Sequence, residues 1–160
     1  MTILYIDADA CPVKDEVYRV AQRYDAPVFV VCNSWIRTPA DPHVRLVVVD
    51  EGPDVADDWI AARAGAGDVV ITADIPLAQR ALAAGAQALH PAGRPFTQDN
   101  IGGALASRAV GEHLRSMGEA TRGPPPFTAA DRSKFLQALD AAVVRARRVP
   151  TGSEQASGRS

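Results

Sequence analysis

Acidic side chains follow two separate apolar stretches of the sequence, at the point where each stretch ends. The segment "ILYIDAD" carries Asp7 and Asp9 one residue apart, and the segment "DVVITAD" ends on Asp74. Carboxylates this close repel one another unless a cation or a set of backbone N–H groups offsets their charge. Oxygen-only ligands suit hard cations such as Mg²⁺ or Mn²⁺. Such an ion can activate water and stabilise charge on a phosphoryl group.

A third group of acids lies between these two in the sequence. In "GPDVADDWI", Asp54, Asp57 and Asp58 stand at i, i+3 and i+4, which places them on one face near the start of a predicted helix. Some of these acids also have a structural interpretation, because Asp54 and Asp74 both stand where a helix N-cap is expected. Three acidic groups on one predicted rim favour a metal site over unrelated caps.

Strands and helices alternate along the chain, and their positions explain why the acids should meet. Apolar runs predict strands, and helical spacing predicts helices. The expected strands are residues 2–6, 27–32, 44–49, 68–72 and 86–89, and the expected helices are residues 12–24, 54–64, 75–85, 98–116 and 129–147. The runs at 27–32 and 44–49 are apolar throughout, which is typical of strands buried on both faces.

This alternation predicts an α/β fold, a three-layer sandwich with a mostly parallel central sheet and additional C-terminal helices. In open α/β sheets, ligands bind at the carboxyl ends of the strands. If the strands that precede Asp7 and Asp74 are neighbours, the acids converge on one rim of the sheet.

Length and composition are those of one ordinary globular domain. At 160 residues the chain can bury a core, and we expect one domain over residues 1–147 and a disordered polar tail over residues 148–160. No apolar run reaches the roughly 18 residues that a membrane span needs, and "MTILYID" lacks the basic start of a secretory signal. Cys11 and Cys32 fit no metal spacing. These features predict a reduced, cytoplasmic protein.

Positive charge is concentrated in the last part of the chain. Residues 1–100 carry 14 acids against 8 Lys and Arg, whereas residues 101–160 carry 5 acids against 9. We expect this basic part to face an anionic substrate, with Lys14, Arg132 and Lys134 as substrate-binding residues. The alternative is that these side chains are ordinary solvated surface.

Two further side chains have open interpretations. Cys11 stands at a predicted helix N-terminus, where a thiol can be activated, but the surrounding carboxylates raise its pKa and disfavour a nucleophile. Trp35, in the loop "CNSWIRTP", either stacks on a nucleic-acid base or packs as a loop anchor.

Four motifs, "DADACPVK", "GPDVADDWI", "GDVVITADIPLA" and "RGPPPFTAADRSKF", resemble in order and spacing those of the bacterial YaiI/YqxD family. The resemblance implies a fold like that of PIN-domain nucleases, an acidic Mg²⁺ or Mn²⁺ site and an RNA substrate. By position, Asp7, Asp57 and Asp74 would be the catalytic acids, and Asp9 would be a further metal ligand. The fourth acid that is common in PIN nucleases shortly after the third is missing, since the next acid after Asp74 is Asp99.

Two other functions remain open. One is a PIN-like scaffold that binds RNA without cleaving it. The other is a haloacid-dehalogenase-like phosphatase, because "LYIDADAC" imitates its DxD motif, with Asp7 as nucleophile and Asp9 as general acid, and "VVIT" imitates its Thr motif. That enzyme also needs an acidic pair after a later strand, and the acids beyond residue 99 stand at no predicted strand end.

Overall fold

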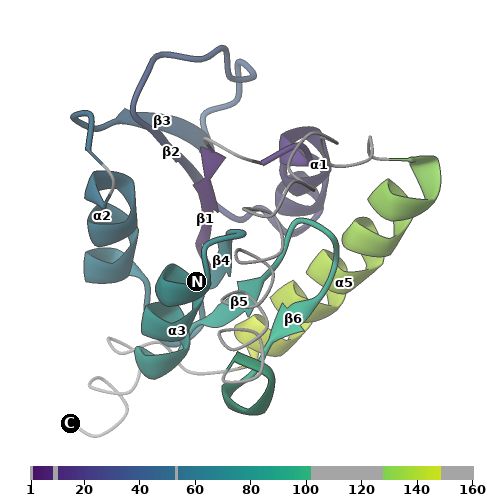
Figure 1. Cartoon of the computed structure of the whole chain (residues 1–160). Helices are drawn as coiled ribbons and strands as arrows, with labels where there is room; N and C mark the ends of the chain where they lie inside the picture. The colour runs from purple at the N-terminus through teal and green to yellow at the C-terminus, as the bar shows by residue number, and fades with distance from the viewer. Residues whose placement is uncertain (1, 9–10, 53, 102–127, 149–160) are drawn as a thin grey trace, which may run out of the picture.

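The alternation of strands and helices is present in the computed structural model, which describes residues 2–8, 11–52, 54–101 and 128–148 (Figure 1). The elements that are bounded within these residues are, in chain order, β1 (Leu4–Asp7), α1 (Lys14–Tyr24), β2 (Val28–Cys32), β3 (Val44–Val48), α2 (Val55–Arg63), β4 (Val69–Ile71), α3 (Ile75–Ala83), β5 (Gln87–Leu89), β6 (Pro95–Phe96) and α5 (Ala129–Arg147). No helix among the described residues is both long enough and apolar enough to cross a membrane.

The sheet has the strand order β3-β2-β1-β4-β5-β6. The first five strands are parallel, and β6 runs antiparallel to β5. From β1 the chain proceeds outward to β2 and β3, then crosses back to place β4 on the other side of β1. The order therefore reverses between β1 and β4. In open α/β sheets, such a switch point is where ligands bind, beside the carboxyl ends of the strands.

Helices cover both faces of the sheet. Alternate side chains of each strand point to opposite faces, so Leu4 and Ile6 of β1 join the core beneath α1 and α5. Tyr5 lies between them in sequence and joins the core beneath α2 and α3. Figure 1 shows α1 and α5 on one side and α2 and α3 on the other. The predicted three-layer α/β arrangement with a mostly parallel sheet is confirmed.

Local side-chain and backbone features determine where helix α5 begins and where helix α1 ends. Thr128 and Asp131 form a capping box at the start of α5, each side chain accepting a hydrogen bond from the other's backbone N–H. Helix α5 then buries Phe135 and Leu139 against the sheet. Helix α1 ends at Asp25, whose left-handed backbone (φ 53°) terminates it.

Two details of the sheet differ from the sequence prediction. Strand β3 is an edge strand, and Val48 is 52% exposed, so the prediction that residues 44–49 are buried on both faces is wrong. An apolar composition alone does not distinguish a buried central strand from an edge strand whose side chains are only partly covered. Strand β6 was not predicted, because it has two residues and begins with Pro95, which a strand tolerates at an edge.

The remaining sequence predictions fall partly or wholly outside the described residues. The helix expected at 98–116 begins at Gln98 and is described as far as Ile101. The rest of that helix, the "GPPPF" part of the last family motif and the tail beyond residue 148 lie outside the described part of the chain.

A glycine allows the turn after β5 to pack closely against helix α5. Gly93 has a φ of +88°, and a Cβ atom at this position would lie 3.2 Å from the backbone carbonyl oxygen of Lys134. Its N–H donates to the carbonyl of His90, which closes the turn. Only glycine combines this backbone conformation with such close approach.

We expect Gly93→Ala to lower the free energy of unfolding by about 1–3 kcal/mol, because the substitution adds both backbone strain and a contact with α5. Gly65→Ala is the matched control, since its Cβ would meet the nearest carbonyl oxygen at 3.9 Å. The control should change stability by less than about 0.5 kcal/mol. Urea denaturation measures both, and equal stability of the two variants would contradict the packing described.

Candidate functional site

A buried hydroxyl links the ends of the two strands at the switch point. Thr72, directly after β4, is 1% exposed. Its Oγ1 donates to Oδ2 of Asp7 at 2.9 Å and accepts from the backbone N–H of Asp74 at 2.9 Å. Strands β1 and β4 are paired, as the rim prediction requires. Asp7 and Asp74 therefore lie at the same edge of the sheet, on either side of the point where the strand order reverses.

Asp74 has a structural role as well as its place on the rim. It is the N-cap of α3, and its Oδ1 accepts from the backbone N–H of Leu77 at 3.0 Å. The cap interpretation of this residue is confirmed. The cap engages Oδ1 of this carboxylate.

Asp57, in the first turn of α2, lies within electrostatic range of both rim acids. Its pKa is raised to about 7, first by burial and then by the negative charges of Asp74 and Asp7, and the Asp74 side chain also hydrogen-bonds to it. Asp57 is therefore partly protonated near neutral pH, unlike an ordinary aspartate. Asp54 holds the N-cap position of α2, but its side chain makes no capping hydrogen bond. The three acids form one electrostatic unit, hereafter the acidic edge (Asp7, Asp57 and Asp74).

The chemistry of these donors suits a hard divalent cation, because all are carboxylate oxygens. However, within the part of the chain that the structure describes, no three His, Cys, Asp or Glu side chains are arranged to hold a metal ion. One oxygen of Asp7 is engaged by Thr72 and one oxygen of Asp74 by the cap. Asp9, the fourth predicted ligand, lies outside the described residues. Metal binding would favour the ionised form of Asp57, because metal ligands must be deprotonated.

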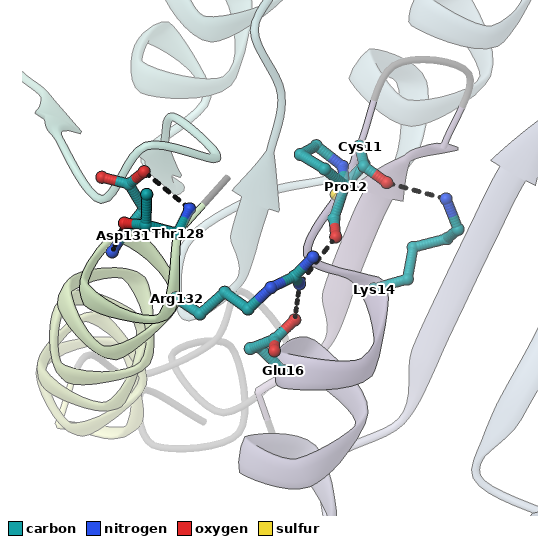
Figure 2. Close-up of polar contacts among 7 residues, drawn as sticks. All are labelled: Cys11, Pro12, Lys14, Glu16, Thr128, Asp131 and Arg132. Atoms are coloured by element: carbon teal, nitrogen blue, oxygen red, sulfur yellow. Dashed lines mark hydrogen bonds and ion pairs between the residues drawn. The ribbon is translucent and has the colours of Figure 1, made fainter. Parts of the chain in front are cut away.

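Two of the three predicted substrate-binding cations contact the connection between β1 and α1 (Figure 2). The Nζ of Lys14 donates to the carbonyl of Cys11 at 2.7 Å. The Nη1 of Arg132, reaching over from α5, donates to the carbonyl of Pro12 and to Oε1 of Glu16, both at 3.2 Å. These contacts hold positive charge beside the segment that leaves Asp7, and they give Arg132 a structural role.

Lys134 lies elsewhere on α5. Its backbone and the base of its side chain adjoin Gly93, in the turn that follows β5. Because β5 is parallel to β1 and β4, this turn also lies at the carboxyl edge of the sheet. The start of α5 therefore spans from the segment after β1 to the turn after β5.

The structure does not support Cys11 as a nucleophile. The thiol is buried, and burial is the main cause that raises its pKa to about 11, with the charge of Asp7 acting in the same direction. A thiol with this pKa is protonated at neutral pH and is a poor nucleophile.

The role of Thr72 at the acidic edge is not predicted from the sequence. The motif "VVIT" drew attention to it only within the phosphatase alternative. A polar residue at the end of an apolar strand, two positions before an acid, is a weak signal. Its importance follows from strand pairing, which puts its hydroxyl beside Asp7.

A parallel α/β fold with acids at its switch point defines a broad class of ligand-binding and catalytic proteins. Within that class, the chain matches the profile described as "Uncharacterized BCR, YaiI/YqxD family" over residues 5–145, and it belongs to that family. It is 71% identical over 149 residues to a UPF0178 protein of a Caulobacter species, covering 93% of this chain and 99% of that protein. It is 58% identical over 147 residues to a UPF0178 protein of Sphingopyxis alaskensis, covering 91% and 96% of the two chains. No solved structure matches the chain significantly.

The state of Asp57 predicts a specific dependence of stability on pH. An Asp pKa is ordinarily 3.8, and that of Asp57 in the folded chain is about 7. Between these values the folded state binds more protons than the unfolded state, so Asp57 lowers stability as pH rises through this window. Asp57→Asn should raise the melting temperature in EDTA at pH 8 by the equivalent of about 1 kcal/mol, allowing for solvent screening, and have less effect at pH 5.

Asp58→Asn is the matched control in the same helix. Asp58 makes an exposed ion pair with Arg80 at 2.7 Å, and such pairs contribute little to stability. Thermal melts of both variants across pH 5 to 8 separate the effects. A pH-independent difference between Asp57→Asn and the wild type would contradict the coupling of Asp57 to the rim acids.

Proposed function

We propose that this protein is a divalent-cation-dependent phosphodiesterase that acts on RNA, with the acidic edge as its catalytic site. The observation that carries the proposal is the meeting of Asp7, Asp57 and Asp74 at the switch point of the sheet. Three carboxyls that share a rim repel one another when ionised, and a bound cation offsets that repulsion. The order of the family motifs, and the likeness to the PIN-domain nuclease fold that the family resemblance implies, also support the assignment.

The roles of the side chains follow from their contacts. When bound, Mg²⁺ or Mn²⁺ would be held by Asp7, Asp57, Asp74 and Asp9, and it would supply charge neutralisation and water activation. Thr72 holds the carboxylate of Asp7 in place, and the start of α3 orients that of Asp74. Asp57, with a pKa of about 7, can hold or release a proton near neutral pH.

A scaffold that binds RNA without cleaving it is the second candidate. The observation that favours it is that the described acids do not form a ready metal site. The phosphatase alternative has less support, because β5 ends at Leu89 and is followed by His90 and Pro91, not by the acidic pair which that enzyme needs.

The direct test is cleavage of a mixed-sequence single-stranded RNA with Mg²⁺ or Mn²⁺. We expect cleavage that stops in EDTA and falls by about 100-fold or more in Asp7→Asn, which removes a charge that would hold the ion. Asp58→Asn, an exposed carboxylate of the same helix, should cleave at close to the wild-type rate. Binding of RNA without cleavage under any of these metals would support the scaffold and contradict the phosphodiesterase.

The substrate side of the proposal concerns Lys14, Arg132 and Lys134. A phosphodiester that approaches an acidic rim is repelled unless neighbouring cations offset the field. The hydrogen bond of Lys14 is to a neutral carbonyl, so its charge still acts on the surroundings, whereas the charge of Arg132 is partly offset by Glu16.

For each variant, the loss of RNA affinity is compared with the loss of stability. We therefore expect Lys14→Ala to lose more affinity for a given loss of stability than Arg132→Ala. Each phosphate contact removed should reduce the slope of log affinity against log salt by about 0.7 for a single strand. Fluorescence anisotropy at 50 to 200 mM salt measures the slope. Unchanged affinity and slope in Lys14→Ala, Arg132→Ala and Lys134→Ala would identify these residues as ordinary surface.

A further inference from the structure

The large apolar side chains that are exposed among the described residues, Trp35 and Val48, both belong to the corner of the sheet where β2 and β3 end. Trp35 is 73% exposed and Val48 is 52% exposed. Trp35 follows the end of β2 by three residues, and Val48 is the last residue of β3. In the parallel register Val48 pairs with Cys32, the last residue of β2, so both side chains belong to the carboxyl edge.

The exposure of Trp35 follows from how its loop is fixed. The thiol of Cys32 donates to the carbonyl of Ser34 at 3.0 Å, which holds the first turn of the loop against the strand end. Ile36 is partly buried and packs on the core beneath α1 and α5. With Ile36 directed inward, its neighbours Trp35 and Arg37 are both exposed. The loop-anchor interpretation of Trp35 is therefore wrong, because Ile36 is the anchor.

This corner adjoins the acidic edge. Strand β2 is the neighbour of β1, and Asp7 pairs with Val31, one residue before the end of β2. The segment that carries Trp35 thus leaves the sheet beside the strand that carries Asp7. The connection between β2 and β3 projects beyond the helices in Figure 1.

We propose that Trp35, with Arg37 beside it in the same loop, forms a platform on which one unpaired base of a single-stranded nucleic acid stacks while its backbone approaches the acidic edge. The choice of a nucleic acid rests on the proposed function. The indole offers an accessible π-face, and the guanidinium two residues away can contact a phosphate. A stable protein interface buries about 800 Å² on each partner, more than two such side chains supply, so the corner suits a base better than a protein.

The platform can be tested without catalysis, in EDTA. Trp59→Phe removes the other tryptophan, leaving Trp35 as the only indole that reports. We expect a mixed-sequence single-stranded 12-mer RNA to quench its fluorescence, and the same RNA annealed to its complement to quench far less, because paired bases cannot stack on the indole. Equal quenching by strand and duplex, or no quenching by either, would overturn the proposal.

Substitutions of Trp35 supply the energetic test. Trp35→Ala should weaken binding of the single strand by roughly 5- to 100-fold, and Trp35→Phe should retain most of the affinity. Both should melt like the wild type, because the side chain is 73% exposed. An association of copies of the chain that is lost in Trp35→Ala, with RNA affinity unchanged, would show that the corner is a protein interface and overturn the platform.

The outcomes for the platform and for the phosphodiesterase differ. Asp7→Asn should leave the quenching intact, since it removes no part of the platform. Quenching by RNA that no metal causes the protein to cleave would contradict the phosphodiesterase and support the platform. Metal-dependent cleavage with the same KM in Trp35→Ala as in the wild type would contradict the platform and leave the phosphodiesterase standing.

Discussion

The hydrogen bonds of Thr72 are the interaction on which the rest of the site depends. Its hydroxyl donates to Asp7 and accepts from the backbone N–H of Asp74, so one buried group connects the ends of β1 and β4. The carboxylate of Asp7 is partly buried at the end of a strand, and removing a charge from water is costly. The hydroxyl offsets part of that cost and fixes the position of the charge. Partial protonation of Asp57, whose pKa is raised to about 7, relieves part of the remaining repulsion near neutral pH.

The scaffold concentrates charge at one edge because of its strand order. Parallel strands end at the same edge, and the helices that follow them begin there. Asp57 and Asp74 accordingly stand at the starts of α2 and α3, where the partial positive charge of a helix N-terminus stabilises a carboxylate. On the opposite face, α5 brings Arg132 to the segment after β1. The acidic edge is thus built from the sheet and from helices on one face, with cations supplied from the other.

Much of this arrangement is predictable from periodicity and position. Apolar runs in the sequence predicted strands β1 to β5. The acids after the first and fourth runs predicted the shared rim. Periodicity does not show which strands lie side by side in the sheet. The exposure of Val48 depends on β3 being an edge strand, the role of Thr72 depends on β4 pairing with β1, and β6 is too short to produce a pattern. The burial of Ile36 in place of Trp35 likewise depends on which side of the loop faces the core.

The central claim is that the acidic edge shares one divalent cation, and Mn²⁺ binding followed by electron paramagnetic resonance tests it most directly. The account predicts one bound Mn²⁺ per chain that Mg²⁺ displaces, with binding weakened in Asp7→Asn and in Asp74→Asn and retained in Asp58→Asn. Absence of bound Mn²⁺ at millimolar concentration, or binding that neither Asp7→Asn nor Asp74→Asn weakens, would contradict it.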